Sequence, residues 1–265
     1  WCLHGLWWGH CGTLETISTV VRPVFGGRAS RAVEFASDSD KEYIAGLNLG
    51  VITNTQGSTG EVLEKRPVCV DRDRLGEVLE EFQGDILQVP PMYSAIKREG
   101  KKLYELARRG QEVERQPRPI TIEALDLLDQ VSPTEYTLRV RCSKGTYVRT
   151  LCHDIGQALG CGGALFSLRR TQSAGFSLDQ AVTMDQVSAH PAPQQLLLPV
   201  DRYFSRYPAL TLRHGTAEKK LRNGNRLTLE GQDGVYRVYS RGGDFLALSR
   251  LEQGALTTIK SFFEV

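Results

Sequence analysis

The chain has 265 residues, with 40% hydrophobic and 24% charged residues, a formal net charge of +2 and an isoelectric point near 8.2. This composition excludes a disordered or fibrous chain, and the length suffices for one large domain and one small domain. The sequence contains no apolar run long enough to span a membrane and no signal-peptide pattern, so we expect a cytoplasmic protein without a membrane partner.

The positive charge is concentrated in two parts of the chain. Residues 195–265 contain 11 Lys and Arg against 7 Asp and Glu, and residues 141–175 contain 5 against 1. A local basic surface is typical of a protein that holds nucleic acid along a groove. The six cysteines form no CxxC pair and no Cys/His set with zinc spacing, so we expect no metal site.

The start of the chain contains one pattern of chemical interest. The chain begins with Trp1, from which we expect a fragment or a disturbed gene start. Residues 9–15, GHCGTLE, combine glycines that let the backbone approach a ligand with His10 and the carboxylate of Glu15. Alone this pattern is weak, because a carboxylate in such a loop more often caps a helix or a turn.

Apolar periodicity predicts the elements that follow. The double proline Pro90-Pro91 makes its surroundings stiff and extended, outside any helix or central strand. We expect a strand at 41–50, a turn-rich link at 51–60, a helix at 72–82, an extended segment at 89–95, a helix at 101–109, and strands at 120–128 and 135–142.

Residues 139–160, RVRCSKGTYVRTLCHDIGQALG, join a strand to a helix through a Lys-Gly turn. We expect Thr146 to cap the helix. Lys144, Tyr147 and Arg149 lie around the turn, and we expect only Asp154 to oppose the cations Arg141, Lys144 and Arg149. A phenol among fixed cations suits an anion or a nucleic-acid phosphate, although an exposed basic turn explains the same residues.

The remaining sequence predicts a boundary and a second domain. Residues 168–171 predict a strand from which Arg169 and Arg170 project, 182–187 close the large domain, and 190–193 form a linker. Short alternating strands at 210–212, 226–229, 235–239, 245–251 and 256–262 are typical of a small β-barrel.

The order and spacing of these motifs resemble the bacterial tRNA pseudouridine synthase B family, the TruB-type tRNA pseudouridine(55) synthases. The matching segments include GRASRAVEFASDSDKEY, LGVITNTQGSTGEV, QVPPMYSAIKREGKKLYELARRG, CSKGTYVRTLCHDIG and LRRTQSAGFSL. The resemblance implies an α+β fold, with a mixed-sheet pseudouridine synthase catalytic domain at 1–190 and a small PUA-like RNA-binding β-barrel at 196–265. The first strand and helix of the catalytic domain are missing or altered.

The resemblance also implies a reaction and a partner. Family members isomerise uridine 55 in the T-loop of tRNA to pseudouridine, after the base is flipped out of its stack, without a metal or an organic cofactor. The implied partner is the T-arm of tRNA, and we expect a monomer.

Four residues receive catalytic roles from the resemblance. Glu15 stands at the position of the nucleophile, Tyr43 would stack on the target uracil, and Tyr147 would take part in proton transfer. Arg149 would pair with the carboxylate and keep it ionised. RNA contacts are expected for His10, Lys41, Lys144, Arg169, Arg170, Lys219, Lys220 and Arg222.

The chain departs from the family where the nucleophile should be. The family pattern GHxGTLDPLATGVLP corresponds here to GHCGTLETISTVVRP, so Glu15 replaces an aspartate. The longer side chain displaces the carboxylate by roughly 1 Å, which costs on the order of 10²-fold in rate. A second hypothesis is therefore a catalytically impaired tRNA-binding or tRNA-folding protein that keeps the cleft. A third, an interaction domain without an RNA role, leaves the local basic bias unexplained.

Overall fold

The computed structural model describes residues 8–10, 18–98 and 100–263, and they fall into two compact units. Unit 1 comprises Trp1–Cys11, Arg22–Ser37 and Val182–Val265, and unit 2 comprises Gly12–Val21 and Asp38–Ala181. The chain therefore passes from one unit to the other more than once. The expected division into domains at 1–190 and 196–265 stays a prediction.

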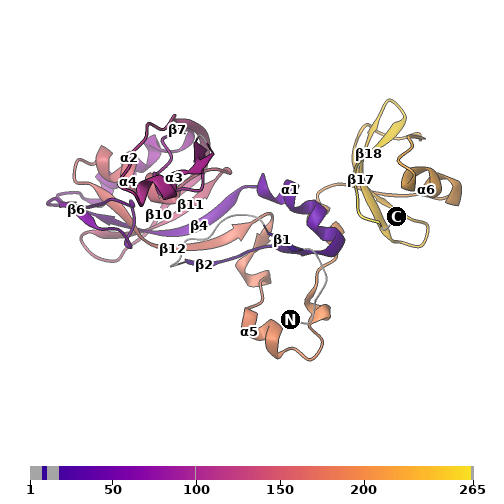
Figure 1. Ribbon diagram of the computed structural model, residues 1–265, viewed down its shortest axis with the longest axis horizontal. Coiled ribbons are helices and arrows are strands. Elements are labelled where there is room, and N and C mark those ends of the chain that lie inside the picture. Colours follow the sequence, from indigo (N-terminus) through magenta and orange to yellow (C-terminus); the bar gives the residue numbers. More distant parts are fainter. Residues whose placement is uncertain (1–7, 11–17, 99, 264–265) are drawn as a thin grey trace. The chain divides into compact units, whose positions relative to one another are not determined.

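Unit 2 is built on a mixed sheet with the strand order β13-β12-β4-β11-β10-β7, and β2 pairs with β12 in parallel (Figure 1). The other neighbours along the order are antiparallel. The strands of this sheet are β2 (Ser18–Val20), β4 (Lys41–Leu49), β7 (Gly84–Gln88), β10 (Arg118–Gln130), β11 (Glu135–Cys142), β12 (Gly163–Ser173) and β13 (Phe176–Ser177).

The central strands confirm the alternation in the sequence. In β11, Leu138, Val140 and Cys142 are buried while Arg139 and Arg141 are exposed, as a strand with one covered face requires. The predicted strands at 41–50 and 135–142 are confirmed within one residue. β10 begins at Arg118, earlier than predicted, because Arg118 and Pro119 pair with Gln88 and Leu87 of the edge strand β7.

Two helices, α2 (Arg72–Glu81) and α4 (Val148–Ala158), cover one face of this sheet (Figure 1). Asp71 caps the start of α2, because its side chain accepts a hydrogen bond from the backbone N–H of Arg74. The helix confirms the prediction at 72–82. The apolar faces of the two helices meet the sheet in one core. Its members from the helices are Leu75, Val78, Leu79, Val148, Leu151, Cys152 and Ile155.

Two small hairpins and a short helix differ from the prediction. The link expected at 51–60 begins with β5 (Val51–Thr53), which pairs with β6 (Val62–Lys65). The helix expected at 101–109 is shorter, because its first residues form β9 (Lys101–Lys102) opposite β8 (Lys97–Arg98), and α3 covers Leu103–Ala107. A short 3₁₀ helix, η2 (Leu178–Gln180), ends unit 2.

Unit 1 contains a five-stranded sheet of order β14-β16-β17-β18-β15 with its own apolar core. The five predicted strands are confirmed: β14 (Ala209–Thr211), β15 (Leu227–Thr228), β16 (Gly234–Tyr239), β17 (Phe245–Glu252) and β18 (Ala255–Ser261). Helix α6 (Gly215–Arg222) was not predicted. The other elements are β1 (Trp8–His10), β3 (Val24–Gly26), η1 (Gly27–Ala32), α1 (Val33–Ser37), α5 (Met184–Ala189), η3 (Pro193–Leu196) and η4 (Val200–Phe204).

The elements confirm an α+β fold. Antiparallel pairing dominates both sheets, and the helices of unit 2 lie on one face of its sheet instead of alternating with parallel strands. Within the described residues, no helix has both the length and the hydropathy that crossing a membrane requires.

We expect Gly156→Ala to lower the free energy of unfolding by about 3 kcal/mol or more, because a Cβ on α4 would collide with the backbone nitrogen of Gly163. Gly76→Ala in α2 is the matched control, since a Cβ there meets nothing within 4 Å. The control should gain about 0.5 to 1 kcal/mol. Urea denaturation of both variants measures the difference, and equal effects would contradict the close contact.

Candidate active site

Tyr147 lies at the joint between β11 and α4, where it is the residue before the first turn of the helix. Gln88 on β7, which is only 4% exposed, holds its backbone from both sides. The side-chain oxygen of Gln88 accepts a hydrogen bond from the Tyr147 N–H at 2.9 Å, and its Nε2 donates to the Tyr147 carbonyl at 3.1 Å. The start of α4 is therefore fixed to the neighbouring strand.

Arg149 follows on the first turn of α4 and is held by two irregular segments. Its Nη1 donates to the Thr55 carbonyl at 3.2 Å, and its Nη2 donates to the Tyr93 carbonyl at 3.0 Å. Gly57 makes room for the side chain, since a Cβ at that position would lie 3.3 Å from the Arg149 Cδ. These two acceptors are neutral carbonyl oxygens, and they hold the guanidinium in a defined orientation.

Tyr43 lies on β4 at the end of the sheet where α4 begins. It is opposite Val140 on β11 and Arg170 on β12, so these three side chains share one face. Tyr43 is half-buried and packs against the core of unit 2. A β-bulge at Thr171, whose hydroxyl donates to Glu42 at 2.7 Å, interrupts the register beside it. Bulges often occur next to active sites, where they redirect side chains.

Two cations of the predicted cluster have carboxylate partners. Arg141 contacts Glu123 at 2.6 Å, and Lys144 contacts Asp38 at 2.7 Å, all four side chains being at least one-third exposed. The expectation that only Asp154 opposes these cations is therefore wrong, because strand pairing and a distant loop supply the partners. Thr146 also does not cap α4; its hydroxyl donates to the Ser143 carbonyl and closes the turn.

The adjacent arginines of β12 point to opposite faces of the sheet. Arg169 is exposed, whereas Arg170 is 2% exposed and its Nε donates to the Val21 carbonyl at 2.9 Å. The structure thus corrects the expectation that both contact RNA: a buried guanidinium bonded to the protein backbone does not meet a phosphate.

The other predicted residues lie as follows. His10 is exposed on β1 of unit 1 with its Nε2 at 2.9 Å from Arg22 Nη2, and Lys41 donates to the Ser39 carbonyl at 2.7 Å. Glu15 lies outside the described residues. On α6, Lys219 and Lys220 are exposed, while Arg222 contacts Glu218 at 2.9 Å and lies over the Phe263 ring.

Sequence reasoning missed the glutamines that support the site. Besides Gln88, Gln56 accepts a hydrogen bond from the Thr150 hydroxyl of α4 at 2.7 Å, and its backbone φ of 60° places it in the left-handed region. The sequence around neither glutamine predicts its role, because the role of a side-chain amide depends on hydrogen-bond partners that lie far away in the sequence. A double proline before Tyr93 was the nearest clue to the irregular segment.

A basic surface around β8, β9 and α3 was also missed, although its composition is visible in the sequence. Tyr104 lies between two cations, with Lys102 Nζ at 5.5 Å and Arg108 Cζ at 5.3 Å from its ring centroid. The cations at this surface are Lys97, Arg98, Lys101, Lys102, Arg108 and Arg109, and all but the half-buried Lys102 are exposed.

Burial changes two titratable groups of α4. Burial raises the pKa of the Asp154 carboxyl to about 6. Burial also lowers the pKa of His153, and a backbone hydrogen bond involving Gly163 partly offsets this by raising it. No group of three or more potential metal ligands occurs among the residues that the structure describes.

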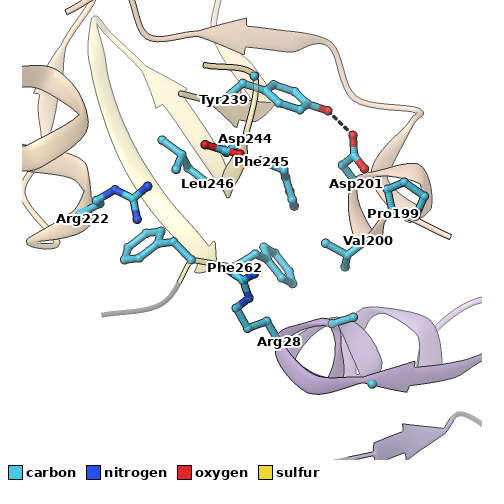
Figure 2. Close-up of a pocket in the computed structure, with 14 residues that line it drawn as sticks. Arg28, Pro199, Val200, Asp201, Arg222, Tyr239, Asp244, Phe245, Leu246 and Phe262 are labelled. Atoms are coloured by element: carbon cyan, nitrogen blue, oxygen red, sulfur yellow. Dashed lines mark hydrogen bonds between the residues drawn. The ribbon is translucent and has the colours of Figure 1, made fainter. Parts of the chain in front are cut away.

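Unit 1 contains a separate cavity of about 740 Å³. Figure 2 shows that Tyr239 donates a hydrogen bond to Asp201 at its wall, at 2.7 Å. Burial, with Asp201 as the second cause, raises the pKa of Tyr239 to about 12. The lining mixes Arg28 and Arg222 with Asp201 and Asp244, which does not favour a phosphate. The residues of unit 2 are the better candidate for chemistry.

Comparison with known proteins shows matches over most of the chain. The family model "TruB family pseudouridylate synthase (N terminal domain)" matches residues 6–148, and "tRNA pseudouridylate synthase B C-terminal domain" matches residues 149–205. The tRNA pseudouridine synthase B of Azoarcus sp. (strain BH72) is 43% identical over 94% of this chain and 83% of its own length. That of Stutzerimonas stutzeri (strain A1501) is 41% identical over 96% and 85%.

Solved structures show the same fold. A Cbf5-Nop10-Gar1 complex matches with a TM-score of 0.70 and 23% identity, over 97% of this chain and 76% of that chain. An H/ACA RNP bound to a substrate RNA containing 2'-deoxyuridine matches with a TM-score of 0.69 and 20% identity, over the same shares. With Tyr43, Tyr147 and Arg149 in family-matching motifs of unit 2, the chain belongs to the TruB family of pseudouridylate synthases.

Proposed function

We propose that this protein isomerises uridine 55 in the T-loop of tRNA to pseudouridine, with Glu15 as the nucleophile. The observation that carries the proposal is the fixed position of Arg149, whose guanidinium is oriented by the Thr55 and Tyr93 carbonyls beside Tyr147. A cation held in advance stabilises a carboxylate and any negative charge that develops during reaction. Tyr147, fixed by Gln88, takes part in the closing proton transfer, and Tyr43 stacks on the flipped uracil.

The direction of β2 supports this role for Glu15. Glu15 precedes Ser18 by three residues, which reach at most about 10 Å. Ser18 pairs with Leu168 in a parallel ladder, and Leu165 lies three residues before Leu168 on β12. At Leu165 the edge of β12 pairs with the loop around Gly57, next to the Arg149 side chain. The three-residue span from Glu15 to Ser18 is therefore enough chain for the proposed pairing of Glu15 with Arg149.

Exposed cations supply the contacts for the RNA backbone. In unit 2, the basic surface around Tyr104 combines an aromatic ring with cations, a composition that suits unpaired nucleotides and phosphates. Arg169 adds an exposed cation on the other face of β12, while Lys41 and Lys144 are already engaged within the protein. In unit 1, we propose that the β domain is PUA-like and binds tRNA through α6, and that His10 inserts into the opened T-loop. The protein acts as a monomer.

The alternative remains a tRNA-binding or tRNA-folding protein with impaired catalysis. Glu15 favours it, because a longer side chain misplaces the carboxylate while leaving the RNA-binding surfaces intact. Tritium release from tRNA labelled at uridine C5, measured beside a tRNA gel shift, separates the two. Binding with release supports the synthase, and binding without release supports the alternative.

Glu15→Asp should raise the rate of pseudouridine formation by about 10-fold or more, because the shorter carboxylate reaches the reacting carbon in a relaxed rotamer. Glu15→Gln should abolish the remaining activity and leave tRNA affinity nearly unchanged. Single-turnover tritium release measures both. A Glu15→Asp variant that binds tRNA normally, keeps its circular dichroism spectrum and gains no rate would exclude Glu15 as a nucleophile limited by reach.

Gln88→Leu should lower turnover more than tRNA affinity, because it removes both partners of the Tyr147 backbone at the start of α4. The unpaired groups should also cost about 1 to 3 kcal/mol of stability. Gln83→Leu, an exposed glutamine just before β7, is the matched control and should change neither. Rates at saturating tRNA and thermal melts test this; parallel losses of affinity and rate would contradict a positioning effect.

Replacing Lys219 and Lys220 together by Gln should weaken tRNA binding and lower the slope of log K against log salt by about 2. Turnover at saturating tRNA should persist, because α6 contributes affinity and not chemistry. The double variant Lys65→Gln/Arg72→Gln removes the same charge from exposed sites in unit 2 and serves as control. An unchanged salt slope in the α6 variant would remove this helix from the RNA interface.

A further inference from the structure

Arg170 is a large buried cation with few acceptors. Its side chain is 2% exposed, its Nε donates to the Val21 carbonyl at 2.9 Å, and its Nη2 is buried and has no hydrogen-bond partner among the residues that the structure describes. A buried guanidinium is costly unless acceptors compensate for lost water. An apolar side chain would fill the same space without the free-energy cost of taking a charge out of water. The hydrogen bond from Arg170 to Val21 therefore indicates a role for this arginine beyond packing.

That contact is one half of a double attachment. The Val21 N–H donates to the Arg170 carbonyl at 3.0 Å, while the Arg170 side chain donates to the Val21 carbonyl. Both hydrogen-bonding groups of one backbone residue are therefore bonded to Arg170. Val21 itself is 2% exposed and directly follows β2, which pairs with β12 at Leu168–Arg170. The end of β2 is held more firmly than strand pairing alone would hold it.

The attached segment is the one that carries the nucleophile position. Val21 is the last residue of Gly12–Val21, the part of unit 2 that contains Glu15. On the other side of β12, Arg170 lies opposite Tyr43 on β4. One side chain thus connects the end of the Glu15 segment to the strand beside the stacking tyrosine. Its neighbour Arg169 lies on the opposite face and makes no such connection.

We infer that Arg170 is a positioning residue, which fixes through Val21 the place where the Glu15 segment meets the catalytic sheet. This inference rests on the proposed function. Arg170 touches neither the RNA nor the reacting atoms; it holds Val21, at the end of β2, against β12. Because misplacement by about 1 Å costs on the order of 100-fold, a loosened segment loses rate while the RNA-binding surfaces stay intact.

Two substitutions separate the hydrogen bond from charge and packing. Arg170→Gln places its amide nitrogen where Nε stands, so it keeps the donor to Val21 and removes the charge. Arg170→Met keeps an unbranched stem of similar length and removes the donor. Hydrogen exchange of the peptide containing residues 18–21 measures the attachment without depending on activity. Single-turnover rates and tRNA affinity measure the consequence.

We expect exchange of this peptide to rise about 10-fold in Arg170→Met and to stay near the wild-type rate in Arg170→Gln. Turnover should fall about 10- to 100-fold in Arg170→Met, with tRNA affinity within about twofold, and recover in Arg170→Gln. An equal loss of turnover in both variants would mean that the charge of Arg170 matters and not its hydrogen bond. Unchanged hydrogen exchange in both would mean that Arg170 does not hold residues 18–21. Either result overturns the inference.

If wild-type and Glu15→Asp proteins both fail to modify tRNA, the proposed function fails. The exchange result still decides whether Arg170 holds the peptide of residues 18–21.

Discussion

The close approach of α4 to the start of β12 is the constraint on which the site depends. Gly156 on the helix and Gly163 on the strand leave no room for a side chain between their backbones. At its other end the helix is fixed by Gln88, which bonds to both backbone groups of Tyr147. A helix held at both ends presents Arg149 at one place, and backbone carbonyls then orient its guanidinium. Packing and hydrogen bonding together thus provide the fixed position that the proposed electrostatic role of Arg149 requires.

Irregular backbone supplies most of the site's acceptors, and regular elements hold that backbone in place. The loop after β5 offers the Thr55 carbonyl to Arg149, and it is attached to α4 through Gln56 and Thr150 and to β12 through Leu165. The proline-containing segment before β8 offers the Tyr93 carbonyl. Loops carry function in many enzymes because a rigid scaffold positions them. Here the scaffold is the sheet and α4, and the loops place the Thr55 and Tyr93 carbonyl oxygens at the Arg149 guanidinium.

The sequence predicted the regular parts of this fold and the motif residues of the site, but not the contacts between distant segments. Period-two burial in β11 and helical spacing in α2 and α4 depend on neighbours along the chain, so they could be predicted. The partners of Lys144 and Arg141 could not, because Asp38 and Glu123 are distant in sequence. The opposite faces of Arg169 and Arg170 follow from strand alternation, which the prediction did not apply to them. Glu15, the residue of greatest interest, lies outside the described part of the chain.

The outer edge of β12 is shared by three partners in succession. The loop at Gly57 pairs at Leu165, β2 pairs at Leu168–Arg170, and β13 pairs at Gln172 and Ser173. An uncovered edge strand offers free backbone groups to other chains and promotes aggregation. The middle partner is the segment that carries Glu15 and is attached through Arg170. Protection of this sheet edge and the proposed placement of the Glu15 carboxylate therefore share one strand, so a change that releases β2 from β12 also exposes a template for intermolecular pairing.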